Sequence, residues 1–218
     1  MAVVIDPGHD GGNGQHPSEI NRQVDDGVGT KACDTAGTQT DDGYTEHAFT
    51  WDVANRLAQL LRSRGAIVYL TRANDVGVGP CVNQRAALGN QHPGAIGISI
   101  HADGGPAGAR GFHVIRPAGI SGLNTAIVAP SSALAIAVRD AVASGTGEPM
   151  AGYVGATNGI VARNDLGGLN LSQIPKVFVE CLNMRDQTDA ALARDPAFRQ
   201  RLAAALADGL ARYSAGAR

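Results

Sequence analysis

The chain has 218 residues, of which 44% are hydrophobic, 17% charged and 4% aromatic, and its formal net charge is -2 at pH 7. This length suits one domain with a large core, so we expect residues 1–218 to form a single domain whose core rests on Val, Ile, Leu and Ala. The near-neutral charge excludes nucleic acid and anionic membrane surfaces as expected partners, because proteins that bind either usually carry a basic patch.

No stretch of the sequence approaches the roughly 20 consecutive apolar residues that a membrane span needs, so we expect no span. The N-terminus leads directly into strand-like sequence, without the regions of a signal peptide. A secreted protein looks the same once its signal peptide has been removed, so this feature does not decide the compartment. We expect a soluble protein and take a monomer as the default.

Apolar runs and helical spacings alternate along the chain. The apolar residues 2–5 predict a buried strand, and residues 6–44, rich in Gly, Asp and Thr, predict a long loop. Such a loop inside a compact domain usually serves a site. The elements expected after it are a helix over 45–61, a strand over 66–71, a helix over 82–88, strands over 95–100 and 111–116, a helix over 131–142, a strand over 176–179 and a helix over 195–210.

This order of elements predicts an α/β fold with a single, twisted, mostly parallel sheet of about six strands and helices on both faces. Parallel strands are covered by helices on both sides, and they therefore have continuous apolar runs like those of this chain. In sheets of this kind, functional residues lie at the carboxyl ends of the strands.

Three polar residues, His9, His101 and Glu180, each lie just after an apolar run that predicts a strand. If these strands are neighbours, the three side chains converge on one cleft, and Glu46 at the start of the first long helix can point into it. Two imidazoles and a carboxylate are a common ligand set of catalytic zinc, and a further carboxylate nearby would serve as general base. A single histidine at a strand end also fits a structural role, so the zinc hypothesis depends on the convergence.

The three cysteines have different surroundings. Cys33 and Cys81 both lie in loops, and a disulfide between them is one hypothesis for a protein of an oxidising compartment, with free thiols as the alternative. Cys181 follows the apolar run KVFVE, which favours a buried, unreactive thiol.

Several motifs occur in a fixed order along nearly the whole chain. They are Pro7-Gly8-His9, Glu46, Thr71-Arg72 with Asp75, Ser99-Ile100-His101, and Glu180 with Asn183. Together these motifs resemble the family 3 type of N-acetylmuramoyl-L-alanine amidases. The resemblance implies an enzyme with one Zn²⁺ ion, in which His9, Glu46 and His101 bind the metal and Glu180 is the catalytic carboxylate.

The resemblance also implies an activity and a location. The activity is hydrolysis of the amide bond between N-acetylmuramic acid and L-alanine in peptidoglycan or its muropeptide fragments, which releases the stem peptide. We therefore expect a secreted, periplasmic or cell-wall-associated bacterial protein without a separate wall-binding domain. The alternatives are a zinc hydrolase of another amide, such as a carboxypeptidase or deacetylase, and a peptidoglycan-binding module. Glu180 argues against the module, since binding needs no base beside an open metal position.

Two positions near the expected metal site leave alternatives open. His47 competes with its neighbour Glu46 as a ligand, but adjacent residues of a helix point in different directions, and we prefer Glu46. Asp10 stands where the family often has Gly. It either orients His9 or, as we favour, is exposed to solvent in a turn.

Other polar residues are candidates for contact with the substrate. Arg72 either binds a substrate carboxylate or forms a structural salt bridge with Asp75. An exposed loop expected over residues 159–171 carries the candidates for contact with the stem peptide, which are Arg163, Asn164 and Asp165. The remaining histidines fit a site less well: we expect His16 and His92 to be solvated in loops, and His113 to face a neighbouring element or solvent.

Overall fold

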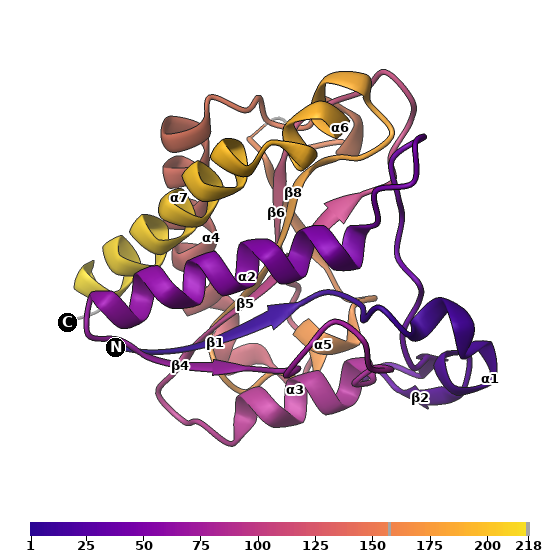
Figure 1. Cartoon of the computed structure of the whole chain (residues 1–218). Coiled ribbons are helices and arrows are strands. Elements are labelled where there is room, and N and C mark those ends of the chain that lie inside the picture. The colour runs from indigo at the N-terminus through magenta and orange to yellow at the C-terminus, as the bar shows by residue number, and fades with distance from the viewer. Residues whose placement is uncertain (157, 217–218) are drawn as a thin grey trace.

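The computed structural model describes residues 1–156 and 158–216, and one twisted sheet forms its centre (Figure 1). Within these ranges six strands pair in the order β4-β1-β5-β8-β6-β7. Their bounds are β1 Ala2–Pro7, β4 Ile67–Leu70, β5 Ile96–Asp103, β6 His113–Pro117, β7 Ile160–Arg163 and β8 Lys176–Asn183. All neighbours are parallel except β6 and β8, which run antiparallel. The predicted α/β fold with a mostly parallel sheet is confirmed.

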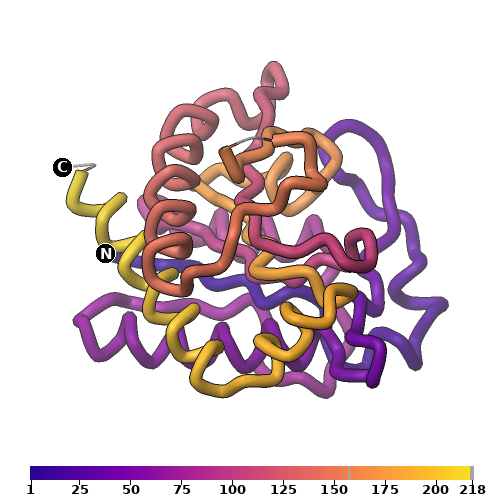
Figure 2. The backbone as a smooth tube through the Cα atoms, turned by 90° about the horizontal axis from the view of Figure 1, so that it is seen from above, coloured from indigo at the N-terminus to yellow at the C-terminus, as the bar shows by residue number. Residues whose placement is uncertain are grey.

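Helices cover both faces of this sheet, as predicted (Figure 1). On one face lie α2 Glu46–Ser63, α4 Thr125–Thr146 and α7 Pro196–Gly216, and α7 packs against both of the others. On the other face lie α3 Val82–Asn90 and α5 Gly167–Asn170. The N-terminus and the end of α7 are found on the side of the molecule opposite residues 10–44 (Figure 2).

The alternating side chains of β1 show how the core is divided between the two faces. Val3 and Ile5 belong to the large core beneath α2, α4 and α7, whereas Val4 packs with Ile174 on the face of α3. Successive residues of a strand point to opposite faces. Asp6 therefore lies on the same face as Val4, and its carboxylate is buried there beneath the functional site.

The ends of the long helices follow the sequence signals in one case and depart from them in another. α7 begins at Pro196, and the Asp195 side chain accepts the backbone N–H groups of the first helical turn, as predicted. The predicted start of α4 at Ser131 was wrong, since the helix begins at Thr125. Ser131 lies inside α4, where its hydroxyl accepts the backbone N–H of Lys176 at 3.0 Å.

Several short elements were not predicted. The prediction of a single loop over residues 6–44 was wrong, because short polar and half-exposed segments there form local structure that has no apolar pattern. The missed elements are a 3-10 turn Asn13–Gln15, α1 Pro17–Ile20, the hairpin of β2 Gln23–Asp25 and β3 Thr30–Ala32, a 3-10 turn Gly152–Val154, the edge strand β7, the short helix α5, and α6 Gln187–Arg194.

Among the described residues, one helix, α4, is long and apolar enough to span a membrane by length and composition alone. The criterion of consecutive apolar residues did not detect it, because polar residues interrupt the helix. The core helix of a folded domain meets the same criterion. Leu134, Val138 and Val142 of α4 are fully buried, and α4 packs along α7 (Figure 2).

The contact between α4 and α7 leaves no room for a side chain at Gly209. A Cβ there would lie 2.8 Å from the Cα of Val138 and 3.1 Å from the carbonyl oxygen of Ala137. We expect Gly209→Ala to lower the free energy of unfolding by about 1–2 kcal/mol, because overpacking against backbone outweighs a gain in helix propensity of about 1 kcal/mol. Urea unfolding measures this change. Gly216→Ala, in the same helix but facing open space, is the control, and a Gly209→Ala protein as stable as this control would contradict the close contact.

Candidate functional site

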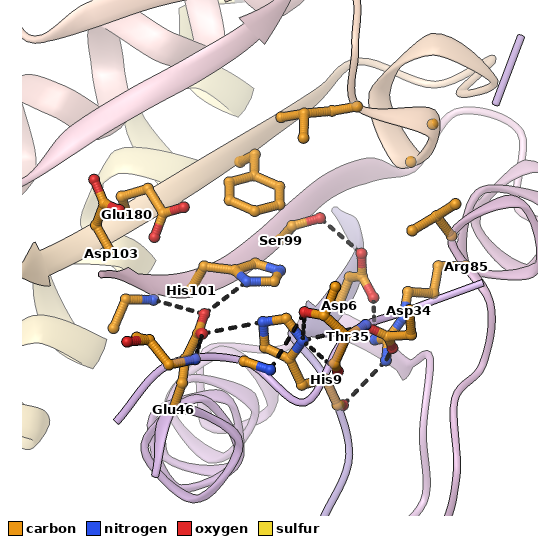
Figure 3. A pocket seen from close by; sticks show the side chains of 18 of the residues that line it. Asp6, His9, Asp34, Thr35, Glu46, Arg85, Ser99, His101, Asp103 and Glu180 are labelled. Carbon is orange, nitrogen blue, oxygen red and sulfur yellow. Dashed lines mark hydrogen bonds and ion pairs between the residues drawn. The ribbon is translucent and has the colours of Figure 1, made fainter. Parts of the chain in front are cut away.

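Three of the predicted site residues meet at the carboxyl edge of the sheet (Figure 3). His9 follows β1, His101 lies near the end of the neighbouring strand β5, and Glu46 is the first residue of α2. Glu46 lies between the two histidines, with Oε2 3.1 Å from Nε2 of His9 and Oε1 2.8 Å from Nδ1 of His101. One ligand atom from each residue lies within 4.8 Å of the others. The three side chains could therefore hold a metal ion together.

Gly8 permits the close approach of the two histidines. Its backbone N–H donates to the carbonyl oxygen of Ile100 at 2.9 Å, which continues the pairing of β1 with β5. A Cβ at Gly8 would lie 2.2 Å from the ring of His101. His9 then adopts a φ of +57°, which ends the extended strand. The Pro7-Gly8-His9 sequence thus has a steric role in forming the group.

The charges of the three side chains depend on one another. Burial lowers the pKa of His9, but the contacts with Glu46 and Asp34 outweigh burial and raise this pKa to about 10. Burial raises the pKa of Glu46, but His9 and His101 outweigh it and hold this pKa well below its usual range. The backbone N–H groups of Thr38 and Ala102 also donate to Glu46, at 2.9 and 3.1 Å. Glu46 is therefore ionised, as a metal-binding carboxylate must be.

A cavity of about 490 Å³ opens beside the three side chains. Its walls include His9, Glu46, His101 and Glu180, together with Lys31 of β3 and the start of α5. Glu180 reaches this cavity because β8 is the neighbour of β5, with Glu180 directly opposite His101 in the parallel register. The structure thus brings the four residues of the predicted site to one cavity.

Glu180 has an unusual environment for a carboxylate. Its Oε2 is buried and has no hydrogen-bond partner within the described part of the chain. Burial, followed by the charges of Glu46 and Asp103, raises the pKa of Glu180 well above its usual value. An unsatisfied buried carboxylate oxygen costs stability, and such groups concentrate at functional sites.

Comparison with known proteins identifies the family. The sequence model of the N-acetylmuramoyl-L-alanine amidase family matches residues 3–212. The chain belongs to this family. It is 45% identical over 217 residues to an N-acetylmuramoyl-L-alanine amidase of Mycobacterium tuberculosis, a match that covers 99% of this chain and 87% of the relative.

Solved structures of similar amidases have the same fold. The N-acetylmuramyl-L-alanine amidase of Mycobacterium smegmatis superposes with a TM-score of 0.92 at 43% identity, covering 99% of this chain and 97% of that one. The apo form of the amidase of Mycobacterium abscessus gives a TM-score of 0.91 at 42% identity, with 98% of each chain covered.

In this member of the amidase family, His113 lies beside Glu180, which the sequence analysis did not predict. The two residues are directly opposite in the antiparallel pairing of β6 with β8, and opposed residues share a face. His113 is 4% exposed, and burial lowers its pKa to about 4. The ring of Tyr153 stands edge-on to it at 6.3 Å, and His113 Nδ1 and the Tyr153 hydroxyl are buried without partners among the described residues. The sequence alone does not show which face His113 occupies, because that depends on the order of the strands.

His47 and Arg72 lie outside the metal-binding group and share Asp75 as a partner. Nδ1 of His47 is 2.9 Å from one oxygen of Asp75, and Nη1 of Arg72 is 2.8 Å from the other. Arg72 is 5% exposed and also donates to backbone carbonyl groups. Glu46 rather than His47 therefore lies with His9 and His101. Of the two alternatives for Arg72, the structure has the salt bridge with Asp75.

The prediction that Asp10 is exposed was wrong. Asp10 is 4% exposed, and its Oδ1 accepts the backbone N–H groups of Gly11 at 2.8 Å and Gly77 at 3.1 Å. The carboxylate satisfies these backbone groups where the loops after β1 and β4 meet. Nδ1 of His9 faces Asp34 instead, at 3.1 Å. The sequence analysis did not single out Asp34.

The segment predicted as an exposed loop around Arg163 is partly a strand, so that prediction was wrong. Arg163 ends β7 and pairs with Asp165 at 2.6 Å, and Asn164 lies in the bend between them. The carbonyl oxygen of Asp165 accepts a hydrogen bond from the Lys31 ammonium group at 2.7 Å. Residues 166–168 then line the cavity. The three candidates for contact with the stem peptide thus lie next to a wall of the cavity.

The structure also shows the surroundings of the other histidines and of the cysteines. His16 is exposed, as predicted, whereas the prediction for His92 was wrong, since it is half-buried and stacks on a tyrosine ring. Cys33 and Cys81 form a disulfide. Cys181 is fully buried, as predicted.

Gly8→Ala tests whether Gly8 sets the position of His101. The added Cβ overlaps the His101 ring, so the ring must move, and we expect the free energy of unfolding to fall by about 1–3 kcal/mol. If this group holds the zinc ion that the family resemblance implies, we also expect elemental analysis to find less zinc in the purified variant. Gly14→Ala is the control, because the nearest atom to its Cβ, that of Ala36, is 3.8 Å away. A Gly8→Ala protein with the zinc content of the control would contradict this role of Gly8.

Proposed function

We propose that the chain is a zinc-dependent N-acetylmuramoyl-L-alanine amidase that hydrolyses the bond between N-acetylmuramic acid and L-alanine in peptidoglycan or its muropeptide fragments. The family match over residues 3–212 and the 45% identity to an amidase of this activity support the reaction. The observation that carries the zinc dependence is the meeting of His9, Glu46 and His101 at the cavity that Glu180 lines.

The chemistry of these side chains fits one zinc ion. Two imidazole nitrogens and a carboxylate oxygen are typical zinc ligands, and three protein ligands leave a position open for a catalytic water. Glu46 is ionised and burial lowers the pKa of His101, so these two side chains offer deprotonated ligand atoms. His9, whose pKa is raised to about 10, would have to give up a proton when a metal binds. A bound zinc ion lowers the pKa of water and polarises the amide carbonyl.

Glu180 would move the proton in this reaction. Its Oε2 has no partner among the described residues and can accept the proton of the attacking water, and its raised pKa makes the ionised carboxylate a stronger base than an ordinary one. The protonated carboxyl group then gives the proton to the leaving amine of L-alanine.

The walls of the cavity offer contacts to the stem peptide. Lys31 lines the cavity, and Arg163, Asn164 and Asp165 lie next to residues 166–168 of its wall. A stem peptide with carboxylate groups would be attracted by the two basic side chains. We propose these residues as substrate contacts.

A bacterial cell-wall location fits both the substrate and the disulfide. Peptidoglycan lies outside the cytoplasmic membrane, and disulfides such as Cys33–Cys81 persist in oxidising compartments. We therefore propose a secreted, periplasmic or cell-wall-associated protein, and we keep the monomer as the default.

The alternative of a zinc carboxypeptidase has less support. Such an enzyme needs an arginine that is free to bind the terminal carboxylate of its substrate. Arg85 lines the cavity but is paired with Asp6 and Asp34, and Arg72 is paired with Asp75. Neither guanidinium is available for a substrate.

Glu180→Gln tests the proposed reaction. The amide keeps the shape of the side chain but cannot accept the water proton, so we expect kcat to fall by about 10²- to 10⁴-fold while zinc binding is retained. Mass spectrometry of muramyl dipeptide after incubation with the protein measures the release of N-acetylmuramic acid and the L-alanyl dipeptide.

Two controls accompany this experiment. Removal of the metal with a chelator is expected to abolish the reaction, and added Zn²⁺ to restore it. Glu19→Gln, at an exposed side chain of α1, is expected to leave the rate unchanged. If Glu180→Gln were as active as Glu19→Gln on muramyl dipeptide and on longer muropeptides, Glu180 would not be the general base.

A further inference from the structure

The ring of His9 has different partners on its two nitrogens (Figure 3). Nε2 faces Glu46 and the proposed metal position. Nδ1 faces the side-chain oxygen of Asp34 at 3.1 Å, the carbonyl oxygen of Thr35 at 3.0 Å and the hydroxyl of Thr35 at 3.3 Å. A neutral histidine that binds a metal through Nε2 carries its hydrogen on Nδ1, so these acceptors select the tautomer and fix the plane of the ring.

The same stretch of chain also contacts Glu46. The backbone N–H of Thr38 donates to Oε2 of Glu46 at 2.9 Å, and the backbone N–H of Glu46 donates to the carbonyl oxygen of Thr38 at 2.9 Å. Gly37 has a φ of +80°, and a Cβ there would lie 2.8 Å from both Glu46 Oε2 and His9 Cδ2. Residues 34–38, which we call the backing segment, therefore position two of the proposed metal ligands.

Arg85 holds the start of the backing segment. Nη2 of Arg85 is 2.9 Å from Oδ2 of Asp34 and also donates to the carbonyl oxygen of His9 at 3.0 Å. Asp34 is therefore a buried link between His9 and Arg85 (Figure 3).

The disulfide joins the two parts of this arrangement. Cys33 directly precedes Asp34, and Cys81 is the N-cap of α3, the helix that carries Arg85. Without the disulfide, two noncovalent links would remain between this part of the chain and α3, namely the hydrogen bond from the Val82 backbone N–H to the Cys33 carbonyl oxygen at 2.8 Å and the ion pair of Asp34 with Arg85. Loss of the covalent link would let the backing segment move relative to α3, and the ligands would then have to be ordered when the metal binds.

We propose that Asp34 and Arg85 are positioning residues for His9, and that the Cys33–Cys81 disulfide raises the zinc affinity of the site by holding them together. This inference rests on the proposed zinc-dependent function. It gives the disulfide a role beyond stabilising the fold, because the residues on either side of the link contact the metal-binding group.

The test measures the zinc dissociation constant of the full chain by competition with a chromogenic chelator. Asp34→Asn keeps the shape of the side chain and removes its charge, and the double variant Cys33→Ser/Cys81→Ser removes the disulfide without leaving thiols to bind zinc. We expect each to bind zinc about 10- to 100-fold more weakly, as is typical when a residue that orients a metal ligand is changed.

Two further variants separate positioning from a general loss of stability. Leu134→Ala removes a fully buried side chain of α4, and Asp208→Asn removes an exposed ion pair with Arg64. Neither touches the backing segment, so we expect both to bind zinc like the unsubstituted protein. Circular dichroism and urea unfolding confirm that each variant is folded at the temperature of the assay.

Combining the substitutions gives the sharpest outcome. If the disulfide acts through Asp34, adding Asp34→Asn to the double serine variant weakens zinc binding by less than the product of the two separate fold-changes in the dissociation constant, because the two changes share one effect. Asp34→Asn with unchanged zinc affinity would overturn the inference, as would a Leu134→Ala protein that loses as much affinity as the serine variant. An unsubstituted protein that binds no zinc would overturn the proposed function itself, so the two failures are distinguishable.

Discussion

The buried carboxylate of Asp6 is the interaction on which the site depends. Its oxygens accept hydrogen bonds from Thr71 after β4 and Ser99 of β5, both at 2.7 Å. Arg85 of α3 and Lys176 of β8 form ion pairs with it at 2.9 and 3.0 Å. Burial raises the pKa of Asp6, but the two cations and two hydroxyls outweigh it and keep the carboxylate ionised. A buried charge of this kind is tolerated only when its partners satisfy it, and removing one partner from such a pair typically costs about 3–5 kcal/mol.

This cluster connects elements that are distant in the sequence but support the same edge of the sheet. Asp6 belongs to β1, and its partners come from the region after β4, from β5, from β8 and from α3. The proposed metal ligands His9 and His101 and the carboxylate Glu180 all lie close beyond these attachment points. The ionic cluster thus fixes the relative positions of the strand ends on the face of the sheet that α3 covers, while α2 supplies Glu46 from the opposite face. A site assembled from scattered residues becomes rigid in this way.

The sequence predicted the parts of the fold that have continuous apolar runs. The inner strands are buried on both faces, and their composition is distinctive for that reason. β7 pairs on one side only and is half-exposed, and the hairpin of β2 and β3 is short and polar, so neither has a pattern that separates it from a loop. The convergence of His9, Glu46 and His101 was a hypothesis from the strand ends and the helix start visible in the sequence, and the family resemblance singled out these three residues as the ligand set.

The residues around that group could not be predicted, because they depend on tertiary contacts. His113 lies beside Glu180 only because β6 is antiparallel to β8, and an alternating strand does not reveal its direction. Asp10 and Asp34 are both acidic residues in Gly-rich loops. In the structure, Asp10 accepts the backbone N–H groups of Gly11 and Gly77, whereas Asp34 contacts the His9 ring. Only the folding of the loops distinguishes the two residues.

The path of the chain between β5 and β6 has a consequence for the timing of proton transfer. These strands are separated by β8, so residues 104–112 cross the end of β8, where the Asn183 amide donates to the carbonyl oxygens of Pro106 and Ala109. The crossing lies at the end of the strand that carries Glu180, and Glu180 lines the cavity. A substrate that fills the cavity would keep bulk solvent from reaching Glu180 through it. In the proposed reaction, a proton taken from water would then be retained until the amine leaves, and hydrolysis would proceed without uptake of a proton from outside during the cleavage step.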